Sequence, residues 1–302
     1  MKVWPSSRWL TGRLKEKRAL AWAVVMIIVL VTVWPLWMVV KTALEPAATL
    51  FNHSADLWPR DPTLDHFRRV LGLLTPEQAI ERGGSGAEID FLRALRNSVL
   101  FTVVVVLCQT LTSAMAAYAF ARLHFPGRDG VFALFLATMM VPGVVTFIPN
   151  FVLMRELGLL NTLTAMAAPF CLMQAGSIFL LRQFFLSLPR DLEEAARIDG
   201  AGTWILFTRI VLPLSSTPLL TCAVLSALAA WNEFFWPYLV AKDESWQVLP
   251  VALQTFRTQT PQGQPDWTGL MAAATLSALP TVVLLLVMGR RVVESVQFSG
   301  GK

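Results

Sequence analysis

Charged residues are scarce in this sequence. Only 15% of its 302 residues are Asp, Glu, Lys or Arg, while 55% are apolar. A soluble domain carries about 25% charged residues. The shortage is concentrated in six runs that contain no charged residue and that are long enough to cross ~30 Å of hydrocarbon as helices. These runs are residues 19–40, 97–120, 131–153, 163–181, 211–231 and 267–288. The sequence therefore predicts an all-α membrane protein with six transmembrane helices, surrounded by lipid.

Ionisable side chains inside the membrane are what secondary transporters and proton pumps use to carry a coupling ion. The six runs offer only neutral polar groups in their place, chiefly Gln109, Asn150 and Gln174. A phosphate-binding GxxxxGK[ST] loop is also missing from the sequence. Any uphill transport must then draw its energy from a partner protein. A secondary, ion-coupled transporter is the first disfavoured alternative.

Groups that would catalyse a reaction or hold a metal are few. The three histidines, at positions 53, 66 and 124, show no ligand spacing, and the three cysteines, at positions 108, 171 and 222, lie inside apolar runs. Metal sites and general acid–base catalysis usually need several such side chains at one depth. We therefore expect no catalytic residue, no metal site and no cofactor in this chain. An intramembrane enzyme is the second disfavoured alternative.

Lysine and arginine are distributed unevenly around the six runs. Fifteen of the 25 fall in residues 1–18, 122–128, 182–209 and 290–302, which lie on one side of the membrane if all six runs cross it. Cytoplasmic flanks carry such an excess, so both termini are expected in the cytoplasm. The net charge of +5 is explained by this bias and indicates no nucleic-acid partner.

The expected topology divides the chain into consecutive parts. Residues 1–18 form a basic cytoplasmic arm, and residues 19–96 hold the first transmembrane helix and an external segment. Residues 97–290 form a core with the other five transmembrane helices, and residues 291–302 form a cytoplasmic tail. Inside the core, residues 182–210 form the longest cytoplasmic loop. That loop is the most informative part of the sequence.

The loop predicts two short helices separated by a glycine. Pro189 and the acidic residues that follow it are typical of a helix start, where carboxylates meet the positive end of the helix dipole. Gly200 predicts a left-handed cap at the end of this helix. A second helix is expected from Thr203 to Pro213. Together the two helices predict an L-shaped hook on the cytoplasmic face.

The order of residues in this loop resembles the EAA loop of permease subunits in ATP-binding-cassette (ABC) importers. The resemblance rests on residues 194–196 (Glu-Ala-Ala), 199–201 (Asp-Gly-Ala), Phe207, 212–213 (Leu-Pro) and Pro218, placed between the fourth and fifth runs. Residues 116–121 (AAYAFA) and 231–237 (WNEFFWP) look like the carbohydrate branch of that family, the maltose and glycerol-phosphate type. The resemblance covers nearly the whole chain.

This resemblance implies a set of partners and roles. The chain would be a bacterial inner-membrane permease that pairs with a different permease, with two copies of an ATPase that bind ATP and Mg²⁺, and with an external sugar-binding protein. The ATPase would dock on the hook. The residues implied in that coupling are Glu194, Ala195, Ala196, Asp199, Gly200, Ala201, Phe207, Leu212 and Pro213.

Two further segments have a place in the resemblance. The external residues 238–264 correspond to a loop that contacts the docked binding protein, with a solvated connector as the alternative. The tail at 290–302 corresponds to one that reaches the ATPase dimer, although its ending, Phe-Ser-Gly-Gly-Lys, departs from the family's usual Gly-Ala-Val-Lys-Gly.

Polar and aromatic side chains within the runs or just beyond them are candidates for the substrate pathway. Amides and a carboxylate can hydrogen-bond sugar hydroxyls, and tryptophan can stack on a pyranose ring or anchor the chain at the membrane interface. The candidates are Asn150, Gln174, Trp231, Asn232 and Glu233, with Trp236 as a second aromatic.

Overall fold

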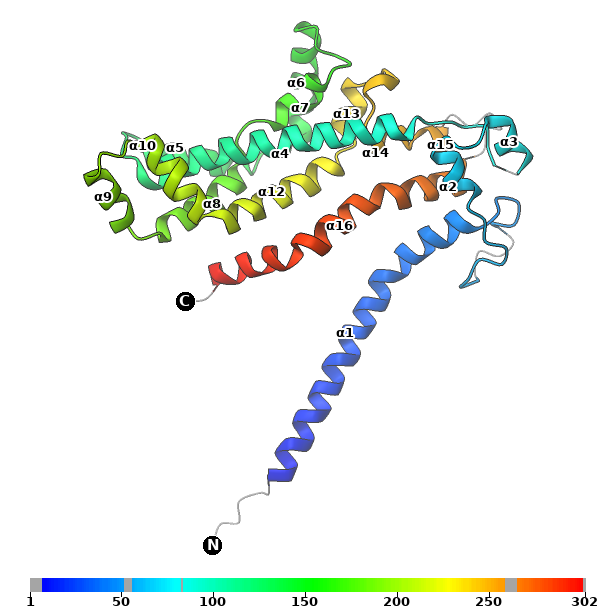
Figure 1. Ribbon diagram of the computed structural model, residues 1–302, viewed down its shortest axis with the longest axis horizontal. Coiled ribbons are helices and arrows are strands. Elements are labelled where there is room, and N and C mark those ends of the chain that lie inside the picture. Colours follow the sequence, from blue (N-terminus) through cyan, green and yellow to red (C-terminus); the bar gives the residue numbers. More distant parts are fainter. Residues whose placement is uncertain (1–6, 52–55, 83, 259–264, 301–302) are drawn as a thin grey trace. The chain divides into compact units, whose positions relative to one another are not determined.

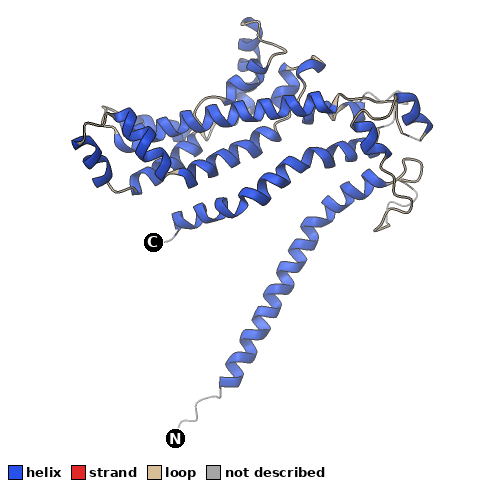
Figure 2. Cartoon of the chain, viewed as in Figure 1, coloured by secondary structure: helices blue, strands red, loops and turns tan. Residues whose placement is uncertain are grey.

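The computed structural model describes residues 7–51, 56–82, 84–258 and 265–300, and of residues 7–17, 19 and 290–300 it describes the backbone alone. This part of the chain is helical and contains no strand (Figure 2). The chain divides into two compact units, which are described separately. One unit joins Met1–Glu88 to Phe256–Thr275, and the other joins Ile89–Thr255 to Leu276–Lys302.

Three helices in the described part are long and apolar enough to cross a membrane alone. They are α1 (Ser7–Leu44) through its segment Leu20–Leu44, α4 (Phe91–Arg122), and α16 (Trp267–Gly300) through its segment Trp267–Gly289 (Figure 1). Two bent pairs meet the same test together. Leu163–Phe170 and Ala175–Ser187 meet at 49°, and Thr203–Leu214 and Ser216–Trp231 meet at 80°. The described residues therefore hold between three and five candidate spans.

The six-span prediction is not confirmed at its third run. Residues 131–153 are divided between α5 (Arg128–Thr138) and α6 (Val144–Glu156), and neither helix passes the test for a span. The break contains Pro142, which has no N–H to donate and disfavours a helical conformation in the residue before it. Composition identified this run as apolar, but proline interrupts its helix.

The first unit holds the external segment that was expected after α1. Its short helices are α2 (Asp65–Val70) and α3 (Pro76–Glu81), and α3 begins with a capping box between Thr75 and Gln78. Two ion pairs are buried in this unit. Lys41 pairs with Glu45 at 3.0 Å, and Arg69 pairs with Asp266 at 2.6 Å, with side chains 4% and 3% exposed in the second pair.

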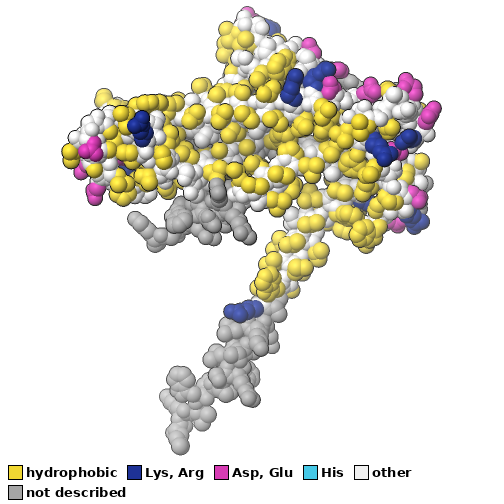
Figure 3. Space-filling model, viewed as in Figure 1, with side chains coloured by type: hydrophobic (Ala, Val, Ile, Leu, Met, Phe, Trp, Pro, Cys, Tyr) yellow, Lys and Arg dark blue, Asp and Glu magenta, His cyan; other side chains and the backbone are white. Residues whose placement is uncertain are grey.

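The second unit is built around α4, which packs against α8 (Ala175–Ser187) and α12 (Ser216–Trp231). Apolar side chains cover much of the surface in this region (Figure 3). Two buried clusters lie at different levels of α4. One surrounds Phe101 together with Met166 of α7 (Leu163–Ala167) and Trp236 of α13 (Phe235–Val240). The other surrounds Phe120 and Phe185. The second cluster supports the loop between α8 and α12.

Candidate functional site

The first helix of the loop is α9 (Asp191–Ile198), and its local structure confirms the prediction from sequence. Asp191, Glu193 and Glu194 lie in its first turn. At its end the N–H of Gly200 donates to the carbonyl of Arg197 at 3.0 Å, and the N–H of Ala201 donates to the carbonyl of Ala196 at 2.9 Å. This pair of bonds is a Schellman motif, which requires a left-handed residue. Gly200 has φ of 85° and supplies it.

The second helical segment runs from Thr203 to Leu214 and is less regular than expected. It begins as α10 (Thr203–Ile205), widens to the π-helix η2 (Leu206–Val211) and ends as α11 (Leu212–Leu214). Pro213 cannot donate to the carbonyl four residues before it, and a π-turn in the preceding residues accommodates that loss. The segment then bends by 80° into α12.

One face of the loop is held against the end of α4 by a buried arginine. Nε of Arg122, in the last turn of α4, lies 2.9 Å from Oε1 of Glu193, and the two side chains are 4% and 10% exposed. Nη2 of Arg122 donates to the carbonyl of Leu188 at 2.8 Å. We call α9 the first arm of the loop and the segment Thr203–Leu214 its second arm. Phe207, in the second arm, is buried with its ring centroid 5.2 Å from that of Tyr118. The motif in the sequence indicates a role for Phe207, but nothing in the sequence indicates the contacts that Arg122, Tyr118 and Glu193 make here.

The opposite face of the loop is exposed and partly apolar. Glu194, Ala195, Asp199 and Gly200 are exposed, and Ala196 and Ala201 are half-buried. The side chain of Ile198 is 87% exposed and that of Trp204 is 65% exposed. Leu212 is half-buried, and Pro213 is exposed where α11 begins. Large apolar side chains with this exposure are typical of surfaces that bind lipid or another protein.

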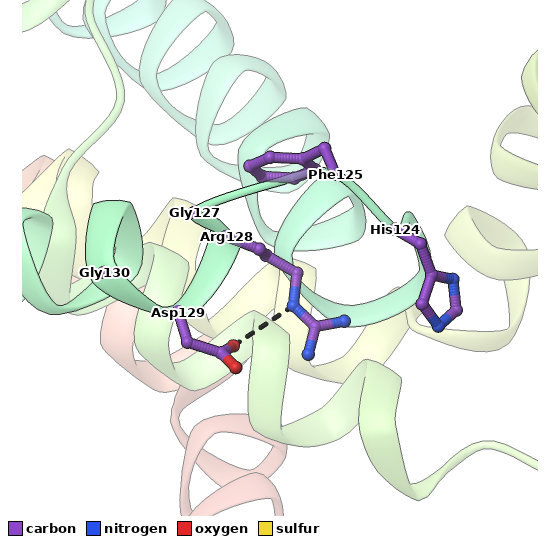
Figure 4. Close-up of a pocket in the computed structure, with 6 residues that line it drawn as sticks. All are labelled: His124, Phe125, Gly127, Arg128, Asp129 and Gly130. Carbon is purple, nitrogen blue, oxygen red and sulfur yellow. Dashed lines mark hydrogen bonds and ion pairs between the residues drawn. The ribbon is translucent and has the colours of Figure 1, made fainter.

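A hollow of about 330 Å³ lies in the turn between α4 and α5 (Figure 4). Its lining includes His124, Arg128 and Asp129, and Arg128 pairs with Asp129 at 3.1 Å. The guanidinium of Arg182, on α8, lies 4.3 Å from the ring centroid of Phe132 and bonds to the carbonyl of Phe120 at 3.3 Å. These contacts tie the turn to the same end of α8 that leads into α9.

Four of the five candidate pathway residues make hydrogen bonds within the chain. Trp231 donates to the carbonyl of Ser277 at 3.0 Å, Asn232 donates to that of Leu228 at 2.8 Å, and Glu233 accepts from the N–H of Trp236 at 3.1 Å. The backbone N–H of Gln174 donates to the hydroxyl of Ser113 at 3.0 Å, and Asn150 is half-buried on α6.

The structure gives packing roles to Trp236, the second aromatic candidate, and to Gln109, a neutral polar residue of the second run. Trp236 is 1% exposed and donates to the carbonyl of Ala165 at 3.0 Å, so its ring is packed and does not face a pathway. Gln109, noted as a neutral polar residue, links α4 to α12 by accepting a hydrogen bond from Ser226. Both residues stabilise helix packing.

The segment at 238–264, which was expected on the external side, is partly packed into the second unit. The N–H of Leu249, in α14 (Leu249–Ala252), donates to the hydroxyl of Ser98 at 2.8 Å, and the amide of Asn97 donates to the carbonyls of Ser245 and Gln247 at 3.0 Å. Lys242, Asp243 and Glu244 are exposed. Residues 259–264, the side chains of 290–300, and residues 301–302 lie outside what the structure describes, so the predicted role of the tail stays a prediction.

Comparison with known proteins identifies the class. Residues 109–297 match the model of the family described as "Binding-protein-dependent transport system inner membrane component". That match covers more than half of the chain, so the chain belongs to this family of ABC-transporter permeases. Permeases of this family are inner-membrane components.

Individual relatives extend the similarity beyond the matched region. The chain is 30% identical over 293 residues to the probable ABC transporter permease YurM of Bacillus subtilis, with 97% of this chain and 89% of that one covered. It is 31% identical over 277 residues to the arabinooligosaccharide permease AraQ of Halalkalibacterium halodurans, covering 91% and 93%. A glycerol-3-phosphate permease, UgpE of Yersinia pestis, is 36% identical over 196 residues, covering 65% and 69%.

A solved structure shows the same fold. A bacterial ABC transporter for import of the acidic polysaccharide alginate contains a chain that matches with a TM-score of 0.75 at 22% identity, covering 96% of this chain and 99% of that one. The chain therefore shares its fold with this solved structure, although only 22% of the aligned residues are identical.

Proposed function

We propose that this chain is one of two different permease subunits in an ATP-driven carbohydrate importer, and that it forms half of the translocation pathway. The observation that carries the proposal is the loop at 182–210. Its α9 is held from inside by Arg122, while Glu194, Leu192 and Ile198 face outward. An exposed, partly apolar helix on a fixed base is suited to docking in a groove of a partner.

The partner on this face is an ATPase homodimer. It would bind ATP and Mg²⁺, while this chain catalyses nothing and binds no cofactor. Closure of the ATPase would be transmitted through the coupling residues to the spans, so that the pathway opens alternately to each side. The coupling residues are Glu194, Ala195, Ala196, Asp199, Gly200, Ala201, Phe207, Leu212 and Pro213. This orientation requires both termini in the cytoplasm.

A carbohydrate substrate is supported by the relatives whose names include arabinooligosaccharides and sn-glycerol-3-phosphate. An external sugar-binding protein would deliver the substrate to the side opposite α9. Along the pathway, the exposed amides of Gln174 and Asn232 are the polar groups with the freest access among the candidates. Asn150, Trp231 and Glu233 are half-buried and would contribute where the pathway narrows.

Reconstitution tests this proposal. The chain alone in liposomes should neither hydrolyse ATP nor take up sugar in a proton gradient. With its partner permease, ATPase and binding protein, it should take up a sugar from a panel of arabino-oligosaccharides, glycerol phosphate and alginate oligomers when ATP is supplied inside. Uptake by the chain alone, driven by protons, would contradict the proposal and favour a secondary transporter.

A further inference from the structure

The last turn of α4 contacts both arms of the loop. Tyr118 and Arg122 are four residues apart, so their side chains lie on one face of the helix. Arg122 contacts the first arm, through Glu193 of α9, and Tyr118 contacts the second arm, through Phe207 of η2. We call these four side chains the clamp. All four are buried, although they border a loop whose other face is exposed.

Arg122 holds the first arm at two points. Its Nη2 donates a hydrogen bond at 2.8 Å to the carbonyl of Leu188, the C-cap residue that directly follows α8. Its Nε lies 2.9 Å from Oε1 of Glu193, two residues into α9. The arginine therefore sets both the entry of the chain into α9 and the face that α9 turns inward.

Two of the three acids in the first turn of α9, Glu193 and Glu194, differ in their surroundings. Glu193 is buried against Arg122, whereas Glu194 is exposed. Successive residues of a helix point about 100° apart, since one turn takes 3.6 residues. Pairing Glu193 inward therefore fixes Glu194 outward, on the surface where a partner docks.

Tyr118 holds the second arm by ring contact. Its centroid lies 5.2 Å from that of Phe207, and Phe207 in turn lies 5.7 Å from Trp204, which is exposed. A force on Trp204 would reach α4 through two ring contacts. The same cluster contains Phe120 and Phe185, so α4 and α8 share one packed core at this end. Close-packed side chains transmit displacement because they leave little free volume.

From this geometry we propose that Arg122 and Tyr118 are positioning residues that transmit motion of the loop to α4. The loop is joined by the backbone only to α8 and α12, and the clamp makes α4 the third helix that moves with it. The inference rests on the proposed function, because it concerns how docking at α9 is used. It assigns coupling to a helix that is distant from the loop in sequence.

The test compares variants of the clamp in the full complex, reconstituted with ATPase, partner permease and binding protein. Arg122→Gln and Glu193→Gln each leave one buried charge without its partner, and the swap Arg122→Glu/Glu193→Arg restores opposite charges. Tyr118→Leu removes the ring contact of the second arm without changing any charge. Asp191→Asn is the matched control, because it removes an exposed acid from the same turn of α9. Measured quantities are ATPase retained on the purified chain and sugar transported per ATP hydrolysed.

We expect the two Gln variants and Tyr118→Leu to retain the ATPase while transport per ATP falls about tenfold, within the usual range of coupling between sites. The charge swap should recover most of that loss, and Asp191→Asn should match the unmodified chain. If both Gln variants and Tyr118→Leu transport as much sugar per ATP hydrolysed as the unmodified chain, the proposed role of the clamp is wrong. If the Gln variants do not reach the membrane, the swap and Tyr118→Leu decide the question by the same ratio. Failure of the unmodified chain to bind the ATPase would instead overturn the proposed function, and the clamp's role with it.

Discussion

Replacing Gly200 by valine should uncouple ATP hydrolysis from transport while leaving the chain in the membrane. Gly200 has φ of 85°, and an added Cβ would meet no atom within 4 Å, so the cost is conformational and not steric crowding by neighbours. A left-handed conformation costs an L-residue ~1–2 kcal/mol, and a β-branched side chain belongs at the upper end. Each of the two Schellman hydrogen bonds is worth about 1 kcal/mol net. Relaxing the strain sacrifices those bonds and reorients α9 relative to α10.

The size of this effect separates coupling from folding. About 1.4 kcal/mol changes an equilibrium tenfold, so a large fraction of the molecules would carry a misdirected α9. The cap is on the surface of the loop and contributes nothing to the buried clusters around α4. The amount of chain in the membrane should therefore stay the same, while retained ATPase and ATP-driven uptake both fall.

Gly202 supplies the matched control. It is two residues away, equally exposed and equally open to an added Cβ, but its φ of −74° and ψ of 165° suit any residue. Gly202→Val should behave as the unmodified chain, and Gly200→Asn should recover part of the activity because asparagine tolerates the left-handed region. Equal, undiminished ATPase retention and uptake in Gly200→Val and Gly202→Val would refute the reasoning.

Three further changes have defined expectations. Glu194→Lys places a cation at the start of α9, where the helix dipole penalises it by about 0.3–1 kcal/mol, and it also alters the docking surface. The amount of ATPase that co-purifies with the chain should therefore fall. Normal co-purification would argue against docking on this surface. Reversing the exposed charges of Lys242, Asp243 and Glu244 should reduce the stimulation of ATPase activity by the sugar-loaded binding protein. Basal ATPase activity and assembly should not change, since residues 248–252 are packed and are left intact. Unchanged stimulation would indicate that this segment is only a connector. Asp266→Asn should destabilise the first unit by about 3–5 kcal/mol, because it leaves Arg69 buried without its partner charge. The measurement is the rate of proteolysis at residues 56–82, which should rise. A rate equal to that of the unmodified chain would contradict the expectation. Burial opposes the charged form of Asp266, but Arg69 and the Ser85 hydroxyl outweigh it and hold the pKa of that carboxyl below its usual value; the stabilisation from Asp266 should therefore be complete above pH ~4 and be lost as pH falls through the lowered pKa.

Local features of the loop could be predicted because they depend on neighbours in sequence. Acids after Pro189 start a helix through the backbone dipole, and Gly200 ends it because only a residue without Cβ takes that φ freely. The start of the second helix at Thr203 follows in the same way. Candidate coupling residues could thus be named before their surroundings were known.

Side-chain partners far apart in sequence could not be predicted in this way. In the sequence Arg122 is only one positive charge on the flank of a run, and nothing near it in sequence indicates that it pairs with Glu193, 71 positions later. The pairing depends on how α4 packs against α8, which places the end of one helix beside the start of the loop. Trp236 is a comparable case, since its buried contact with Ala165 removes it from any pathway.

The sequence by itself determined the membrane class, the family resemblance and the glycine-capped helix, because apolar run length, residue order and backbone preference are local properties. Only the tertiary structure decided which runs are unbroken helices and which acid of α9 faces inward. It also decided that Arg69 and Asp266, 197 positions apart, form a buried pair. Those outcomes depend on packing, because a buried charge is tolerated only where the fold brings its partner to it.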